Sequence, residues 1–269
     1  MVLLLAGDTA ATTPEGRRLI AALDLSAGEA FAAVARSDAG NAERRIALRK
    51  ACIRAWLDQL AVARQACADL LVVPGAGLSP LALDWCASHP HGRAIELDYQ
   101  SVSTKRALIN QCAAPSVSSR IECAECDVYN ESELTRALVA SGWTPDTPSV
   151  WVAEGLAYYI SHDALRNLVR TALSGSPDSR FILEFACPRD ELSEGVRERT
   201  GAYLDTLASM LGGTRLHEVD IWALAHDARV RIERLLHAGE MEDALGWPRH
   251  FHAASDTTLR LALLAPQPG

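Results

Sequence analysis

Short, continuous apolar runs alternate with amphipathic stretches over most of the chain. Apolar runs bounded by turn residues are typical of strands that are buried on both faces of a sheet. The predicted strands are 69–73, 93–98, 120–127, 149–153, 180–185 and 257–264. Because helices of about ten residues separate most of them, the pattern indicates right-handed βαβ crossovers and a mostly parallel sheet.

The amphipathic stretches predict helices that cover this sheet. These predicted helices are 81–88, 102–112, 131–141, 162–173, 191–211 and 221–245. Before the first strand the pattern is helical to about residue 70, with apolar residues at steps of three and four in the run that opens at Asn41. We therefore expect an α/β fold: a Rossmann-like, doubly wound, mostly parallel seven-stranded sheet with a helical N-terminal extension and a late helical insertion.

This organisation predicts one domain over 1–269 with three functional parts. Residues 1–68 form a helical cap, 69–187 form the cofactor-binding core, and 188–269 supply substrate-side helices and the final strands. A chain of 269 residues is long enough to bury a substantial core.

Composition narrows the possible partners. The 26 Lys and Arg against 34 Asp and Glu give a net charge of −8, which argues against nucleic acid, whose binding depends on basic residues. No apolar run reaches the roughly 18 residues needed to span a bilayer. The apolar start of the chain, 1–8, has no basic residues and is too short for a signal peptide. We expect a cytoplasmic protein without a membrane partner.

The cysteines give no sign of a metal site. Seven are scattered along the chain, and only Cys123 and Cys126 form a CxxC pair. Both fall on a predicted strand, where positions three apart point to opposite faces, so they cannot readily share one metal ion. We expect no bound metal.

The candidate chemistry lies where the predicted strands end. Ligands of open parallel sheets bind beyond the carboxyl ends of the strands. Four such ends carry Gly75-Ala76-Gly77, Glu96 with Asp98, Asp127 with Val128, and Glu154 with Gly155. Glycines allow close backbone approach, one carboxylate can accept from ribose hydroxyls, and another can accept from an adenine amino group. Together these residue types predict an adenosyl ligand.

A dinucleotide-dependent oxidoreductase is the alternative for such a glycine turn. Its G-x-G-x-x-G fingerprint requires a very small residue at the third glycine position, where this chain has Pro80. No basic residue near the turn is placed to hold a pyrophosphate. The pattern therefore favours a phosphate-free adenosyl cofactor such as S-adenosyl-L-methionine.

Three segments resemble the leucine carboxyl methyltransferase family, a branch of the class I S-adenosylmethionine-dependent methyltransferases. Residues 72–78 (VVPGAGL) are similar to its motif I, and 95–99 (IELDY) with Lys105 to its E-x-D segment. Residues 148–160 (PSVWVAEGLAYYI) are similar to its most specific motif. The resemblance covers roughly 44–186. One departure is Ser79-Pro80, which stands where family members usually carry Asp-Thr.

The resemblance implies roles for individual residues. Gly75 and Gly77 would line the methionine portion of the cofactor, Asp98 would bind the ribose, and Glu154 the amino group. Asp127 and Val128 would hold the adenine. An arginine of the N-terminal helix would pair with the cofactor's carboxylate, and Arg49, Lys50 and Arg54 all lie near the implied position. Arg49 is favoured over Lys50, because a guanidinium binds a carboxylate through two parallel hydrogen bonds.

The predicted function is an S-adenosylmethionine-dependent O-methyltransferase that esterifies a carboxylate of a small molecule. A carboxylate is already ionised at neutral pH and needs no general base, whereas a hydroxyl acceptor would need one. Tyr158 and Tyr159, just after the fourth strand, are the residues expected to contact the substrate. The alternatives are methylation of a hydroxyl group or of a protein C-terminus, and a non-catalytic adenosyl-binding regulator.

Overall fold

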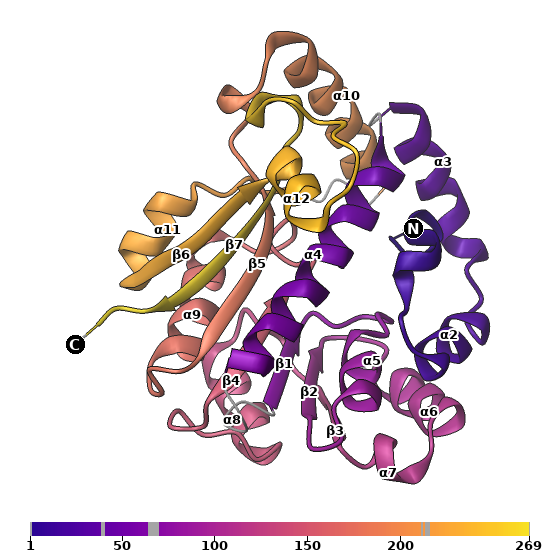
Figure 1. Ribbon diagram of the computed structural model, residues 1–269, viewed down its shortest axis with the longest axis vertical. Coiled ribbons are helices and arrows are strands. Elements are labelled where there is room, and N and C mark those ends of the chain that lie inside the picture. The colour runs from indigo at the N-terminus through magenta and orange to yellow at the C-terminus, as the bar shows by residue number, and fades with distance from the viewer. Residues whose placement is uncertain (1, 39–40, 64–69, 211, 213–215, 269) are drawn as a thin grey trace.

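A computed structural model describes residues 2–38, 41–63, 70–210, 212 and 216–268. A seven-stranded sheet in the order β3-β2-β1-β4-β5-β7-β6 forms its centre (Figure 1). The strands are β1 (Leu70–Pro74), β2 (Arg93–Asp98), β3 (Ile121–Glu125), β4 (Ser149–Ala153), β5 (Arg180–Ala186), β6 (Val230–His237) and β7 (Leu259–Pro266). The first five strands are parallel, and β7 runs antiparallel between β5 and β6.

Helices cover both faces of this sheet. The helices are α1 (Val2–Ala6), α2 (Pro14–Ala21), α3 (Glu29–Asp38), α4 (Ala42–Ala63), α5 (Leu81–Ser88), α6 (Val102–Cys112), α7 (Pro115–Ser118), α8 (Glu131–Ala140), α9 (His162–Leu173), α10 (Glu194–Met210), α11 (Ile221–Ala228) and α12 (Ala238–Leu245). Short 3₁₀ turns are η1 (Gly7–Ala10), η2 (Ser26–Gly28), η3 (Arg189–Glu191) and η4 (Ala254–Asp256). The predicted doubly wound α/β fold with N-terminal helices is confirmed.

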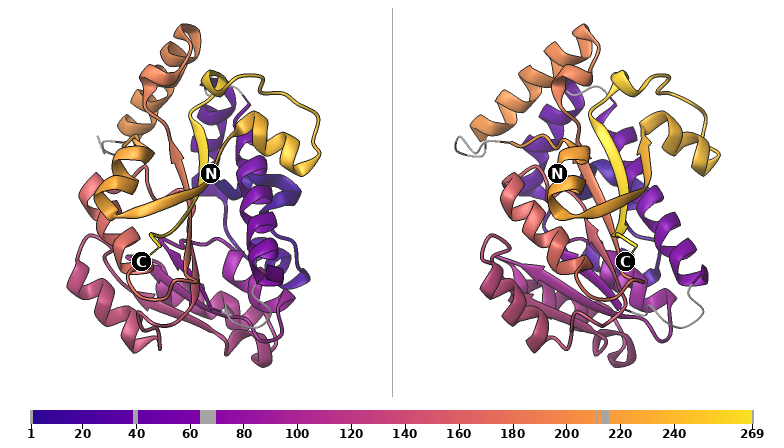
Figure 2. Two further views of the ribbon diagram at one scale, coloured as in Figure 1. Left: turned by 60° about the vertical axis from the view of Figure 1, so that its left-hand side comes forward. Right: turned by 90° about the vertical axis from the view of Figure 1, so that its left-hand side faces the viewer.

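Two hydrophobic layers sandwich the sheet. One layer packs α8, α9 and α11 against it, and the other packs α2, α4, α5, α6 and α12 (Figure 2). Cys126 belongs to the first layer and Cys123 packs against the second, so the CxxC pair does point to opposite faces. Among the described residues, no group of His, Cys, Asp or Glu is arranged to hold a metal ion.

A third, smaller cluster joins the N-terminal elements. Leu5, Ala35 and Ile46 come from α1, α3 and α4, and Tyr203 of α10 packs against the same cluster. In Figure 1, α3, α10 and the beginning of α4 lie together at the top of the view, whereas the rest of α4 crosses the face of the sheet. In the described part of the chain, no helix is long and apolar enough to cross a membrane.

One prediction about the elements was wrong. The stretch 221–245 was expected to be helical throughout, but Val230–His237 forms the edge strand β6 between α11 and α12. Its ladder with β7 has a register shift between Ile232 and Arg234. That irregularity breaks the alternation of a regular strand and leaves Ile232, Leu235 and Leu236 at helix-like spacing. The predicted boundary between residues 68 and 69 lies outside the described residues.

Candidate active site

A cavity of about 470 Å³ lies over the carboxyl ends of β1, β4 and β5. Its floor is the turn after β1 and the loop after β4. Its walls come from α1, α4 and α10. Nine of the residues predicted from the sequence line it: Arg49, Lys50, Gly75, Ala76, Gly77, Glu154, Gly155, Tyr158 and Tyr159. The structure thus brings together the N-terminal helix, the glycine turn and the loop after the fourth strand.

The glycine turn requires backbone conformations that other residues rarely adopt. Gly75 has φ +63° and Gly77 has φ +48°. A Cβ atom at Gly75 would come within 2.8 Å of Leu156, whereas one at Gly77 would meet nothing within 4 Å. Gly77 therefore leaves open space beside the cavity, as a cradle for a bound ligand would.

Lys105 holds this turn in place from below. Its Nζ donates to the carbonyl oxygens of Gly77 and Ser79 at 3.0 and 2.6 Å, and it pairs with Glu96 at 3.0 Å. Both charged side chains are buried, at 3% exposure each. Glu96 thus lies under the turn, paired with Lys105, and not in the main cavity.

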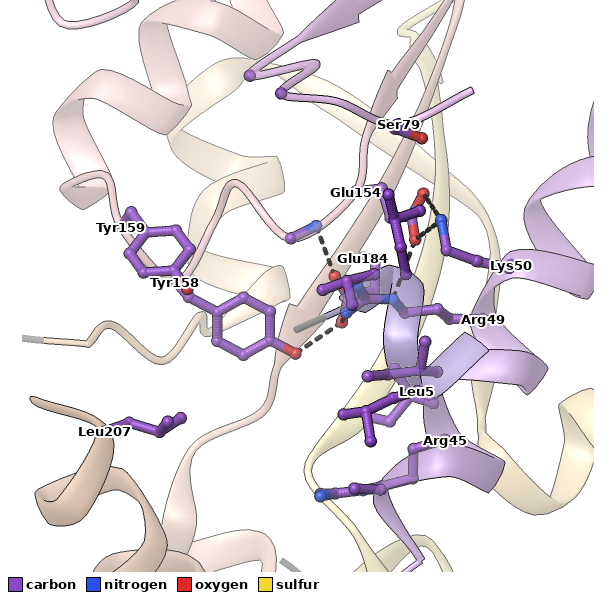
Figure 3. Close-up of a pocket in the computed structure, with 18 of the residues that line it drawn as sticks. Leu5, Arg45, Arg49, Lys50, Ser79, Glu154, Tyr158, Tyr159, Glu184 and Leu207 are labelled. Carbon is purple, nitrogen blue, oxygen red and sulfur yellow. Dashed lines mark hydrogen bonds and ion pairs between the residues drawn. The ribbon is translucent and has the colours of Figure 1, made fainter. Parts of the chain in front are cut away.

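Opposite charges gather at one end of the cavity (Figure 3). Arg49 Nε lies 3.1 Å from Glu154 Oε1, and Arg49 Nη1 lies 3.2 Å from Glu184 Oε1. Lys50 Nζ lies 2.9 Å from Glu154 Oε1. All four side chains are less than 10% exposed. We call these four residues the charged end of the cavity.

The pKa values follow from these pairings. Burial by itself opposes ionisation of Glu154, but Lys50 and Arg49 outweigh it and lower the pKa of Glu154 to about 2. Burial also opposes the charge of Arg49, yet Glu184 and Glu154 raise its pKa above the ordinary value. Burial lowers the pKa of Lys50 despite Glu154. Arg49 therefore stays positively charged to a higher pH than Lys50 does.

Glu184 is a residue of the site that was not predicted from the sequence. This carboxylate is fully buried in β5 and accepts hydrogen bonds from the Gly155 N–H at 2.8 Å and the Tyr158 hydroxyl at 2.6 Å, besides pairing with Arg49. A lone carboxylate within the apolar run 180–186 is the signal that could have revealed it, because a buried charge requires partners.

The two predicted tyrosines differ in their surroundings. Burial and Glu184 raise the pKa of Tyr158 well above its ordinary value, so its phenol stays neutral and donates to Glu184. Tyr159 is 43% exposed, and its carbonyl oxygen accepts from the Tyr129 hydroxyl at 2.6 Å. Both side chains line the cavity, but Tyr158 is not a base.

Three other predicted residues lie outside the main cavity. Asp98 lines a small adjoining pocket, where it accepts from the N–H groups of Gly77 at 2.6 Å and Gln100 at 2.9 Å. Asp127 accepts from the Tyr129 N–H at 2.9 Å, and Val128 packs against the hydrophobic layer. Asp127 and Val128 line neither cavity, although they follow β3 at the same edge of the sheet.

Arg54, one of the three basic residues considered for the cofactor's carboxylate, points elsewhere. Its guanidinium donates to the carbonyl oxygens of Thr9 and Ala10 and pairs with Asp84 at 3.0 Å. It does not line the cavity. Arg54 thus ties the N-terminal segment to α5, which leaves Arg49 and Lys50 as the basic residues at the charged end.

Comparison with known proteins shows the family to which this chain belongs. A model of the family described as leucine carboxyl methyltransferase matches residues 8–173. The chain belongs to the leucine carboxyl methyltransferase family. The resemblance predicted from the motifs is confirmed, and with it the class of S-adenosylmethionine-dependent methyltransferases. The oxidoreductase alternative is thereby removed.

Relatives by sequence carry names of the same class. A candidate S-adenosyl-L-methionine-dependent methyltransferase from Streptomyces avermitilis is 34% identical over 49% of this chain and 44% of its own length. A counterpart from Mycobacterium tuberculosis is 29% identical over 83% of this chain and 76% of its own length. The chain thus spans less than half of the first relative and about three quarters of the second.

Solved structures share the fold at low sequence identity. A DUF574 family protein from Streptomyces avermitilis superposes with a TM-score of 0.63 at 13% identity, covering 99% of this chain and 100% of its own. Magnesium protoporphyrin IX methyltransferase from Synechocystis, solved with bound SAH, gives 0.51 at 13% identity, covering 90% and 95%. These similarities support the class I methyltransferase fold alone.

Proposed function

We propose that the cavity binds S-adenosyl-L-methionine at its charged end and that the enzyme methylates a carboxylate of a small molecule. The observation that supports this most is the group of paired charges beside an open glycine turn, in a member of a carboxyl methyltransferase family. The methionine portion of the cofactor is a zwitterion. Arg49 and Lys50 would bind its carboxylate, and Glu154 its amino group.

The structure offers two further features that suit this ligand. Ser79 lines the cavity, and its Oγ is buried without a hydrogen-bond partner among the described residues, so a ligand's polar group could satisfy it. Asp98, which accepts a hydrogen bond from the Gly77 N–H of the glycine turn, would bind the ribose. Asp127 and Val128 would hold the adenine beyond β3.

When bound, the cofactor supplies a methyl group already activated by its sulfonium. The protein therefore needs mainly to position the acceptor, and positioning of this kind can contribute about 7–11 kcal/mol. A carboxylate acceptor is ionised on arrival and needs no base. This agrees with the neutral state of Tyr158, whose hydroxyl is already bonded to Glu184. Tyr158 and Tyr159 would contact the acceptor as walls of the cavity.

Arg49 and Glu184 would fix the geometry of the site. Glu184 joins α4, the loop after β4 and Tyr158 through its bonds to Arg49, Gly155 and the Tyr158 hydroxyl. These three partners restrict the orientation of the Glu184 carboxylate. The cofactor's carboxylate would thus meet a guanidinium that is already oriented.

A transfer assay tests this proposal. The protein is incubated with S-adenosyl-L-methionine labelled in the methyl group and a panel of carboxylic acids, alcohols and peptides with a free C-terminus, with cofactor turnover as the readout. We expect a labelled product that mild base releases as methanol, which marks an ester. A base-stable product would indicate a hydroxyl acceptor. Binding of S-adenosylhomocysteine without turnover on any acid, alcohol or peptide C-terminus would favour a non-catalytic regulator.

A further inference from the structure

Away from the paired charges the lining of the cavity is mainly apolar, with Arg45 as its cation and Asp24, Thr200 and Tyr203 as its other polar side chains. Side chains of α1, α4 and α10 form its wall; they include Leu3, Leu5, Ile46, Leu204 and Leu207. Arg45 lies among them, one helical turn before Arg49 on α4. Figure 3 shows Arg45 reaching along the cavity below Leu5, apart from Glu154 and Glu184.

Arg45 forms no ion pair within the part of the chain that the structure describes. Its guanidinium makes no hydrogen bond or ion pair with any residue that the structure describes, and its Nε is shielded from solvent. By contrast, Arg49 and Lys50 are satisfied by Glu154 and Glu184. A cation without a counter-ion in apolar surroundings costs stability, and burial accordingly lowers the pKa of Arg45. A bound anion would remove that cost.

The charges of the whole cavity indicate the sign of its second ligand. Its described lining holds three cations, Arg45, Arg49 and Lys50, against Glu154, Glu184 and Asp24. Asp24 lies exposed, where it accepts from the Ser26 N–H. The carboxylate and ammonium groups of S-adenosyl-L-methionine cancel each other, so its sulfonium adds one further positive charge. A loaded cavity therefore calls for an anionic acceptor.

We propose that Arg45 binds the carboxylate of an acceptor whose remaining body is apolar and packs against α1 and α10. This inference rests on the proposed function and names its substrate class. In the reaction, one carboxylate oxygen forms a bond to the methyl carbon while the bond from sulfur to that carbon breaks and its electron pair stays on sulfur. The products are a neutral ester and a neutral thioether. The ester no longer pairs with Arg45, which favours its release.

Binding of simple probes tests the role of Arg45. Octanoate and phenylacetate, and the methyl ester of each, are titrated by calorimetry into protein saturated with S-adenosylhomocysteine. We expect at least one of the two carboxylates to bind wild-type protein about tenfold or more tightly than Arg45→Gln, since a charge-assisted pair is lost. Arg45→Lys should retain part of the affinity. The methyl esters should bind wild type and Arg45→Gln alike.

A matched control separates this site from a general loss of positive charge. Arg36→Gln removes a cation from an exposed pair with Glu43 that does not line the cavity, so it should leave carboxylate binding unchanged. Urea unfolding of each variant verifies that it folds. Equal carboxylate affinity in wild type and Arg45→Gln would overturn the proposal. So would absence of binding of both carboxylates to wild-type protein.

The outcome remains distinguishable from failure of the proposed function. If S-adenosylhomocysteine does not bind wild-type protein, the cofactor proposal fails. The same titrations without S-adenosylhomocysteine then decide the carboxylate site separately, with the same expected difference between wild type and Arg45→Gln. If S-adenosylhomocysteine binds but Arg45→Gln changes nothing, only the inference about Arg45 fails.

Discussion

The two ends of the cavity are built in opposite ways. At the charged end, Arg49, Lys50, Glu154 and Glu184 satisfy one another within 3.2 Å. At the other end, where the lining is mainly apolar, the Arg45 guanidinium makes no hydrogen bond or ion pair with any described residue. The first end suits a zwitterion, because a balanced set of charges can bind both signs. The second suits a ligand that brings a single negative charge. Under the proposed function, the cofactor would bind at the first end and the acceptor at the second.

The ends also differ in how they are encoded along the chain. Glu154 and the glycine turn follow parallel strands directly, so their position is determined by local sequence and by the sheet. The apolar wall comes from α1 and α10, which lie far apart in sequence and meet only in the folded chain. The acceptor end can thus vary without disturbing the cofactor end.

The largest effect is expected from breaking the charged end at its buried centre. Glu184→Gln removes the charge that partners Arg49 and weakens the bonds to Gly155 and Tyr158. Breaking a buried pair by removal of one partner costs about 3–5 kcal/mol. We expect a loss of this order in the free energy of unfolding, measured by urea denaturation.

An exposed glutamate serves as the control for that variant. Glu43→Gln breaks the pair with Arg36. The side chain of Glu43 is 59% exposed and that of Arg36 is 50% exposed. Exposed pairs contribute about 0–1 kcal/mol, so this variant should unfold almost as wild type does. Equal stability losses for the two variants would show that the charged end is not held together as described.

The acid dependence of stability sharpens the same comparison. Glu154 has a pKa of about 2 in the folded chain against a reference of 4.5. Its folded pKa is lowered, so the stability it contributes is complete above about pH 4.5 and is lost as the pH falls toward 2. The total is on the order of 3 kcal/mol. Glu154→Gln should therefore show a shallower loss of unfolding free energy than wild type over that range. Parallel pH profiles of the two proteins would contradict it.

A smaller effect is expected in the small pocket that adjoins the glycine turn. Asp98→Ala removes a carboxylate that we assign to the ribose and that bonds to the Gly77 N–H. Hydrogen bonds to charged groups contribute about 1.5–3 kcal/mol, which corresponds to roughly a 10- to 100-fold weaker affinity for S-adenosylhomocysteine. Calorimetric titration measures this. Unchanged affinity would remove Asp98 from the site.

The sequence was sufficient to predict the parts of the site that lie on strand ends. Burial on both faces makes each parallel strand a continuous apolar run, and the residue after it falls at the ligand edge. This rule located Gly75, Gly77 and Glu154 in the cavity. The same rule could not distinguish Glu96 from the residues that line the cavity. Glu96 also lies at the end of a strand, but it pairs with Lys105 beneath the turn.

Other features depend on contacts that no local pattern records. Arg45 and Arg49 lie on the same helix at helical spacing. Only the folded structure shows that Arg49 pairs with Glu184, whereas Arg45 forms no ion pair with a described residue. The edge strand β6 was missed because its register shift removes the alternation that marks a strand. Both features arise from tertiary structure.

One calorimetric comparison tests the division of the cavity most directly: the affinity of S-adenosylhomocysteine for wild type, Glu154→Gln and Arg45→Gln. S-adenosylhomocysteine keeps the zwitterion that we assign to the charged end. We predict that Glu154→Gln weakens binding about tenfold or more, whereas Arg45→Gln leaves it unchanged. Equal losses in the two variants, or a loss in Arg45→Gln alone, would contradict the assignment of the cofactor to the charged end.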